Sequence, residues 1–205
     1  MSGRMGFRGV CALVVGAALP VLSVGVALPA HAVEACTTRT VSQPFTRWAD
    51  SNYYFPVTSG TFESGTSGWT VSSGVGVVRE NEPWTVTGSG AYSLKIPAGG
   101  SASTPTMCIA SDEDSVRFFY KSPGVSLSSL YVTMKTTQPL NPNVASTTTF
   151  NLDGSKAGWV LSPRIILPSS RDANGQQNLQ ITLSSRGSAA DWQIDDVFVD
   201  PSRVR

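Results

Sequence analysis

Histidine is nearly absent from this sequence of 205 residues, and its scarcity excludes several kinds of enzyme. The only histidine, His31, lies in an N-terminal segment with the features of an export signal. Without histidine, neither a Ser-His-Asp triad nor a Cys-His dyad can form, and zinc sites built from His and Cys are excluded. A Gly-x-Ser-x-Gly elbow, a phosphate-binding glycine loop and a dinucleotide fingerprint are also missing. We therefore expect no catalytic activity and no organic cofactor.

Clusters of Lys and Arg are missing as well. The chain has 15 basic residues, but Arg4 and Arg8 belong to the N-terminal segment, so the 14 acidic residues slightly outnumber the basic ones that remain. A charge so close to zero gives no electrostatic reason to expect nucleic acid or an anionic membrane as a partner. Polymeric or neutral ligands fit this composition better.

Residues 1–32 are typical of a signal peptide. The stretch Val10–Leu28 is apolar, and Ala30-His31-Ala32 is a small-x-small cleavage site. A retained membrane anchor is the alternative, because the apolar run is nearly long enough to span a bilayer. Pro20 and the cleavage site favour removal. We expect a secreted protein with no membrane segment after cleavage.

Two cysteines, Cys36 and Cys108, remain once Cys11 has left with the signal. An even pair of cysteines in an exported protein indicates a disulfide. On the chain-entropy model, closing this loop would stabilise the fold by about 4 kcal/mol. Two free thiols are the alternative, whereas a lipid anchor at Cys36 is disfavoured by Glu34, which stands where a small residue is needed.

The remaining chain reads as a series of short strands, since no apolar face recurs at helical spacing. Strands rich in Ser, Thr and Val, separated by Gly and Pro turns, predict an all-β antiparallel β-sandwich. We expect one sandwich domain over residues 61–205, preceded by an irregular aromatic strap over residues 33–60. The predicted strands are Trp69–Ser73, Val75–Arg79, Tyr92–Ile96, Ser101–Ile109, Val116–Lys121, Leu130–Lys135, Thr147–Leu152, Trp159–Leu167, Leu179–Ser184 and Trp192–Val199.

Ligand-binding candidates follow from the faces of two central strands. Alternation places Arg117 on the outer face of one strand, and Tyr131 and Lys135 on the outer face of the other. If these strands pair in register, the three side chains share one sheet face with Phe119, and such a half-polar, half-aromatic face suits a sugar. An ordinary solvated face, with Phe119 covered by a loop, is the alternative.

The tryptophans divide into two groups. Trp69 and Trp192 lie in strands and are expected in the core. Trp84 follows a proline and Trp159 follows Lys156-Ala157-Gly158, so both are candidates for exposed sugar-stacking rings.

Carboxylates are the other candidate group. Asp195 and Asp196 stand side by side where the alternation of the last strand changes phase, and burying such a pair costs free energy unless a cation or several donors satisfy it. Glu80 and Glu82, followed by Trp84, resemble the carboxylate pair and aromatic platform of a glycosidase. The alternative is that both are charged residues of a surface turn, which explains their spacing more simply.

The segment Phe62-Glu63-Ser64-Gly65, followed by Trp69, and the closing strand Ile194-Asp195-Asp196-Val197 resemble the ends of jelly-roll modules of the galactose-binding-like superfamily, to which many carbohydrate-binding modules belong. The resemblance implies a jelly-roll sandwich without catalytic activity. It also implies a structural calcium ion, with Glu63 and one or both of Asp195 and Asp196 as ligands.

Further segments are similar to a family of small, uncharacterised secreted proteins of actinobacteria, which supports export, the disulfide and a single domain. They are Cys36-Thr37-Thr38-Arg39, Ser42-Gln43-Pro44-Phe45, Pro97-Ala98-Gly99-Gly100, Met107-Cys108 and Val116-Arg117-Phe118-Phe119. We expect a monomer that binds extracellular carbohydrate or cell-wall glycan. A structural or interaction protein of the cell envelope or spore surface is the alternative.

Overall fold

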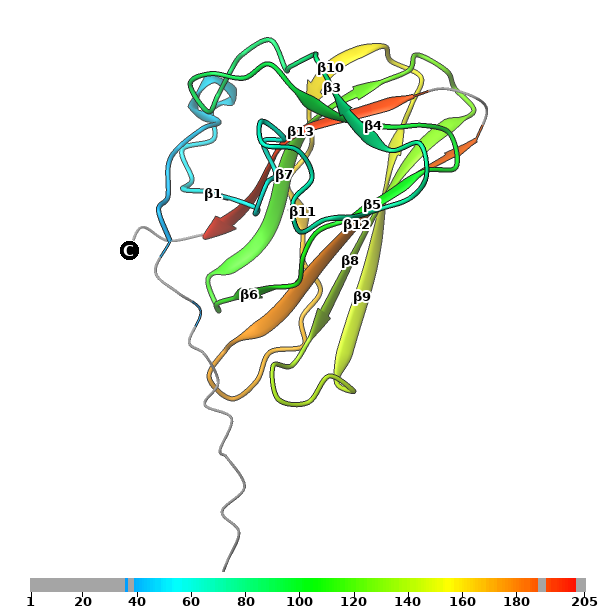
Figure 1. Ribbon diagram of the computed structural model, residues 1–205. Helices are drawn as coiled ribbons and strands as arrows, with labels where there is room; N and C mark the ends of the chain where they lie inside the picture. The colour runs from blue at the N-terminus through cyan, green and yellow to red at the C-terminus, as the bar shows by residue number, and fades with distance from the viewer. Residues whose placement is uncertain (1–35, 37–38, 188–190, 202–205) are drawn as a thin grey trace, which may run out of the picture. The chain divides into compact units, whose positions relative to one another are not determined.

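The computed structural model describes Cys36, residues 39–187 and residues 191–201. The expected signal peptide lies outside these residues. Figure 1 shows strands arranged in two layers, and both sheets are antiparallel, so the predicted all-β sandwich is confirmed. Within the described ranges, helix is confined to the single 3-10 turn η1 (Thr46–Trp48). No helix in this part of the chain is long and apolar enough to cross a membrane.

The first layer is a seven-stranded sheet in the order β10-β7-β13-β4-β3, with β1 paired to β13 and β11 paired to β7. Its strands are β1 (Phe55–Pro56), β3 (Gly76–Val78), β4 (Ser93–Ile96), β7 (Glu113–Ser122), β10 (Gly158–Leu161), β11 (Ile165–Ile166) and β13 (Trp192–Pro201).

The second layer is a six-stranded sheet in the order β2-β5-β12-β8-β9, with β6 paired to β12. Its strands are β2 (Thr70–Val71), β5 (Ser101–Ser103), β6 (Met107–Ile109), β8 (Ser128–Thr137), β9 (Ala145–Asp153) and β12 (Gln177–Gly187).

Two predicted strands are each divided in the structure at a proline. The stretch Ser101–Ile109 becomes β5 and β6, separated around Pro105, and Trp159–Leu167 becomes β10 and β11, separated around Pro163. Proline has no backbone N–H to donate to a neighbouring strand, so the ladder stops on either side of it.

The main core lies between the sheets and follows the predicted alternation. Along β8 the residues Leu130, Val132 and Met134 are buried, and the residues between them face outward. Trp69 and Trp192 are both buried, as expected, and the indole N–H of Trp192 donates to the Ser128 hydroxyl at 2.8 Å. A paired indole nitrogen lets this large ring fill the core without leaving a polar atom unsatisfied.

A second aromatic cluster covers the outer face of the seven-stranded sheet. Phe119 of β7 and Phe198 of β13 point away from the main core and pack against Phe45, with ring centroids 5.8 and 5.4 Å apart. All three rings are buried. Phe119 is thus covered, as the sequence-based alternative expected, by the N-terminal segment, but the face around it is an aromatic cluster and not an ordinary solvated one. The boundary between strap and sandwich at residue 60 stays a prediction.

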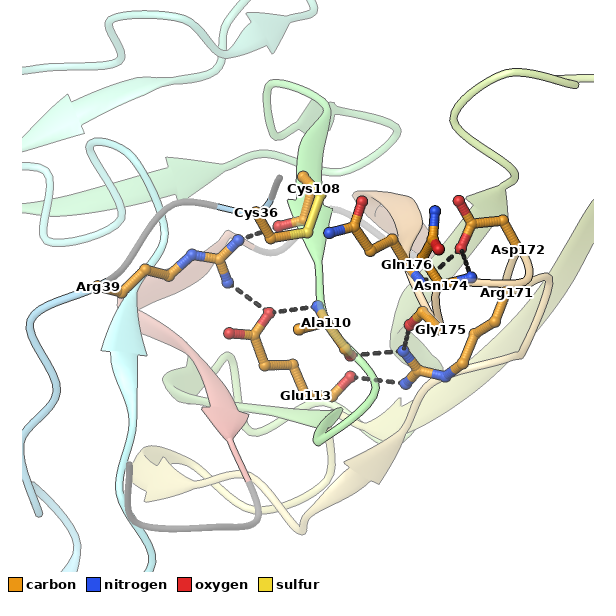
Figure 2. The surroundings of a disulfide bond; sticks show 10 residues. All are labelled: Cys36, Arg39, Cys108, Ala110, Glu113, Arg171, Asp172, Asn174, Gly175 and Gln176. Carbon is orange, nitrogen blue, oxygen red and sulfur yellow. Dashed lines mark hydrogen bonds and ion pairs between the residues drawn. A yellow bond between two sulfur atoms is a disulfide. The ribbon is translucent and has the colours of Figure 1, made fainter. Parts of the chain in front are cut away.

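The predicted disulfide joins Cys36 to Cys108 of β6. Figure 2 shows two arginines near it. Arg39 donates to the backbone carbonyl of Cys108 and pairs with Glu113 at 2.6 Å, while Arg171 donates to nearby backbone carbonyls, including that of Gly175 at 2.9 Å. The disulfide and the contacts of Arg39 tie the N-terminal segment to the sandwich.

Candidate functional site

The expectation that Arg117 shares a sheet face with Tyr131 and Lys135 is wrong. β7, which carries Arg117, pairs with β13, β10 and β11, whereas β8, which carries the other two, pairs with β12 and β9. Alternation determines which residues of one strand share a face, but it does not determine which strands become neighbours. Tyr131 and Lys135 lie on the outer face of the six-stranded sheet. Arg117 belongs to the other layer.

Arg117 is held by the N-terminal segment. Its guanidinium pairs with Asp50 at 2.5 Å and donates to the Ser162 carbonyl at 3.0 Å, and its side chain is only 14% exposed. Burial alone would raise the pKa of Asp50, but hydrogen bonds from Tyr54 and Asn52, together with Arg117, lower it overall. These contacts give Arg117 a role in attaching this segment to β7.

Trp84 and Trp159 lie beside the aromatic cluster of the same sheet and are half-buried. The Trp84 ring packs against Phe119 and Trp48, with centroid distances of 5.2 and 5.1 Å. Trp48 of η1 is a third half-buried ring there, which sequence reasoning left within the strap. Each of these rings uses part of its surface to cover Phe119 or its neighbours. The five predicted ligand-binding residues are thus divided between two opposite surfaces.

The outer face of the six-stranded sheet is formed by polar residues in register. One row crosses five strands through Thr70, Ser103, Thr182, Thr133 and Thr149. Within it, the hydroxyls of Ser103 and Thr182 lie 2.8 Å apart, and those of Thr133 and Thr149 lie 3.0 Å apart. We call this row the hydroxyl row. Short, paired side chains on a sheet present their oxygens in a fixed pattern.

The neighbouring row carries the aromatic residue of this face. It runs through Ser101, Ser184, Tyr131 and Asn151, again directly opposite one another. Outward rows are two residues apart along a strand, or about 7 Å. Lys135 lies two rows beyond Tyr131, opposite Gln180 and Thr147. A further row at the other end holds Arg186, Ser129 and Asp153. We call the outer face formed by this row, the Tyr131 row, the hydroxyl row and the Lys135 row the polar face.

A hollow of about 470 Å³ opens at the end of the polar face. Above Tyr131 lies the guanidinium of Arg186, 5.1 Å from the ring centroid. Sequence reasoning missed this hollow, because it forms only when the turn before β5 meets the end of β12. The run of glycines at that turn was the available signal. The hollow is lined by Gly99, Gly100, Ser101, Ser184, Ser185, Arg186 and Gly187.

The acidic pair of the last strand lies at a β-bulge. The register of β13 against β7 shifts between Asp195 and Phe198, and Asp196 has a φ of 50°. A bulge inserts an extra residue, which is why the alternation changes phase here. Both carboxylates are buried. Asp195 accepts backbone N–H groups from Glu82 and Asp196 at 3.2 and 2.9 Å, whereas Oδ2 of Asp196 has no hydrogen-bond partner among the described residues.

Two further carboxylates act on this pair from neighbouring loops. Glu82 is buried, and its oxygens accept the backbone N–H groups of Trp84 and Val86 at 2.5 and 2.8 Å. Glu63 is exposed and accepts two backbone N–H groups of the loop before β4, at 2.9 and 3.0 Å. The negative charges of both glutamates act on Asp196.

Burial and negative neighbours shift the protonation of the acidic pair. Burial, followed by the charge of Asp196, raises the pKa of Asp195 to about 8. Burial, followed by the charge of Glu82, raises the pKa of Asp196 to about 7. A cation would favour the ionised forms. Within the described ranges, however, no group of three or more His, Cys, Asp or Glu side chains is arranged to hold a metal ion.

Comparison with known proteins shows similarity of fold. No protein-family model and no curated protein matches the chain. An arabinose-bound α-L-arabinofuranosidase, MgGH51, matches with a TM-score of 0.51 and 13% identity, over 74% of this chain and 27% of that one. The module TmCBM61, in complex with β-1,4-galactotriose, matches with a TM-score of 0.49 and 18% identity, over 70% of this chain and 95% of that one. The non-crystalline cellulose-specific carbohydrate-binding module CBM28 matches with a TM-score of 0.48 and 15% identity, over 69% of this chain and 93% of that one.

Proposed function

We propose that the protein is a secreted, non-catalytic module that binds extracellular carbohydrate or cell-wall glycan on the polar face of the six-stranded sheet. The observation that carries this proposal is the pair of in-register rows, one of hydroxyls and one containing Tyr131, beside a hollow. Export is supported by the signal-like residues 1–32. The fold comparison is consistent with this function and leaves the ligand open.

The chemistry of the polar face suits a sugar chain. Hydroxyls both donate and accept hydrogen bonds, as the hydroxyls of a sugar do. The ring of Tyr131 offers an apolar surface for the C–H groups of a sugar ring. Because the side chains stand on paired strands, little conformational freedom is lost on binding.

Glu80 and Glu82, the two glutamates that resemble a glycosidase pair in the sequence, both have their carboxylates engaged by neighbouring groups of the protein. This supports binding of carbohydrate rather than its hydrolysis. Glu80 pairs with Lys121 and accepts the amide of Gln193 at 2.9 Å. Those contacts lower its pKa, Lys121 contributing most. The carboxylate of Glu82 is buried and bonded to two backbone N–H groups. A general acid needs a raised pKa and access to the scissile oxygen, and neither glutamate combines the two.

Calcium binding at the β13 bulge is a second part of the proposal. The buried Oδ2 of Asp196 lacks a hydrogen-bond partner among the described residues, and carboxylate oxygens are ligands that calcium prefers. Asp195 is the second candidate ligand, and backbone carbonyls would supply the others; Glu63, the third carboxylate predicted from sequence, does not form one metal-holding group with the pair among the described residues. Bound calcium would neutralise the repulsion within the pair. A calcium-dependent rise in melting temperature is the expected signature.

Replacement of Tyr131 tests the binding face. In pull-down and isothermal titration with a panel of soluble and insoluble polysaccharides, we expect the protein without its signal peptide to be retained on one glycan class. Tyr131→Ala should weaken that binding roughly fivefold, the value of one stacking contact of about 1 kcal/mol. Tyr92→Ala is the matched control, because Tyr92 is an exposed tyrosine away from the polar face. Equal binding by Tyr131→Ala and the wild type would refute the proposed face.

A structural or interaction protein is the alternative function, and the edge strand β9 favours it. β9 pairs only with β8 in the described part of the chain, and between Ser146 and Leu152 it carries no charge and no proline to block further pairing. Leu140 and Val144, at the end of the β8–β9 hairpin, are 65% and 41% exposed. Sedimentation analysis tests it: concentration-dependent assembly without glycan affinity would support this function, and a glycan-binding monomer would exclude it.

A further inference from the structure

We propose that the glycan bound by the polar face is anionic, and that Arg186 and Lys135 bind its charged groups. This inference rests on the proposed glycan-binding function and specifies the chemistry of its ligand. The net charge of the chain does not suggest such a ligand. The local distribution of cations does.

Five of the eleven described basic side chains are paired with a carboxylate. Arg39, Lys95, Arg117, Lys121 and Arg164 each form an ion pair with a carboxylate. In contrast, neither Lys135 nor Arg186 has a carboxylate within ion-pair distance among the described residues, although both lie on the polar face. A face that carries two unpaired cations attracts anions.

Arg186 is oriented by Tyr131. Its guanidinium carbon lies 5.1 Å from the centre of the tyrosine ring, a cation–π distance. A cation–π contact uses none of the guanidinium N–H groups as hydrogen-bond donors to an oxygen, so they remain able to donate. Arginine donates in a planar fork that matches both oxygens of a carboxylate or phosphate. Tyr131 therefore supports the cation with one face of its ring, and a sugar that stacks on Tyr131 must use the other face.

The hollow beside Arg186 has the composition of an anion subsite. Arg186 is its only charged residue, and glycines and serines form the rest. Ser101 and Ser184, which face outward on β5 and β12, are the serines of this lining that can offer hydroxyls to a ligand. A volume of about 470 Å³ lies within the roughly 300–1,000 Å³ range of small-ligand sites. One charged sugar unit is a suitable occupant.

Lys135 supplies a second cationic position on the same face. It lies four residues along β8 from Tyr131, a separation of about 13 Å. Two cations so spaced suit a polymer that repeats its charge. The acid of this face, Asp153, lies on the edge strand β9, opposite Ser129. Its carboxylate accepts the backbone N–H of Ser155 at 2.6 Å, and this contact, with Lys156, lowers its pKa.

Charged and neutral forms of the same polysaccharide test the preference for an anionic glycan independently of glycan binding itself. The probes are polygalacturonate and the same polymer after its carboxyl groups have been reduced to alcohols, together with dextran and dextran sulfate. We expect binding to at least one polyanion, weaker binding to its neutral counterpart, and loss of the difference as salt screens the charges. A difference in affinity between polygalacturonate and its reduced form would indicate recognition of carboxylates, and a difference between dextran sulfate and dextran would indicate recognition of sulfates.

Variants then locate the effect. Arg186→Ala should weaken polyanion binding about tenfold, since a hydrogen bond to a charged group is lost, and Arg186→Lys should restore part of it. Arg79→Ala is the control, because Arg79 is an exposed arginine away from the polar face. Thermal unfolding of each variant confirms folding. Equal affinity for the charged and neutral polymers, or equal losses for Arg186→Ala and Arg79→Ala, would overturn the inference and leave glycan binding intact. Binding to none of a broad glycan panel would overturn the proposed function itself.

Discussion

At the scale of single residues, Arg117 shows how strongly context decides a role. An arginine on a strand with outward-facing aromatics resembles a ligand-binding residue. In the structure the N-terminal segment covers it, and Asp50 pairs with it at 2.5 Å. Both side chains are largely buried, at 14% and 13% exposed, so the pair is shielded from salt and water. Its contribution is therefore to stability.

We expect Asp50→Asn to destabilise the protein by roughly 2–4 kcal/mol at neutral pH, because it leaves Arg117 buried without its counter-charge. The pKa of Asp50 is lowered in the folded state, so its contribution is present above the unfolded pKa of 3.8 and is lost as pH falls through the lowered value. The difference between the wild type and the variant should therefore shrink as pH falls below 3.8. Urea unfolding at several pH values measures it.

Asp191→Asn is the matched control for this prediction. Asp191 and Lys95 form an ion pair of 3.4 Å in which the side chains are 50% and 37% exposed. Exposed pairs contribute less than about 1 kcal/mol. Equal losses of stability in the two variants would contradict the structural role of Asp50.

At the scale of elements, the bulge in β13 combines a backbone irregularity with buried charge. Asp196 adopts a positive φ there, and its Oδ2 is buried without a partner among the described residues. Such a geometry costs free energy unless something compensates for it. Bound calcium would provide that compensation.

We expect calcium at saturating concentration to raise the melting temperature by about 5–10 °C relative to chelator, in line with a binding contribution of roughly 2–3 kcal/mol. Asp196→Asn should abolish this response, and in chelator it should be at least as stable as the wild type because the repulsion between this carboxylate and its acidic neighbours is gone. Asp153→Asn, a change at an exposed carboxylate far along the chain, should keep the response. Identical melting curves of the wild type with calcium and with chelator would refute the site.

Local sequence patterns predicted most of the strands, but they did not predict which strands pair with one another in the sheets. The alternation in Leu130–Met134 and the phase change at Asp195 and Asp196 are visible in the chain itself, because each depends on neighbouring residues. The pairing of β7 with β13 depends on residues far apart in sequence, so the predicted grouping of Arg117 with Tyr131 failed. The hollow was out of reach for the same reason, since it needs both Gly99 and Arg186.

At the scale of the whole molecule, the two outer faces of the sandwich differ in character. The outer face of the seven-stranded sheet is covered by the N-terminal segment and its aromatic rings. The outer face of the six-stranded sheet carries hydroxyls, Tyr131 and, beside a hollow, two cations that form no ion pair with the residues the structure describes. The covered face supports the fold, and the polar face is the surface we propose for ligand binding.

The most direct test of the central claim is a map of amide chemical shifts in the ¹⁵N-labelled protein, without its signal peptide, as it is titrated with the polysaccharide that retains it. We predict that the largest changes fall in β5, β8, β9 and β12, around Tyr131 and Ser184. Changes concentrated instead around Trp48, Trp84 and Trp159 would place the ligand on the opposite sheet and contradict the account.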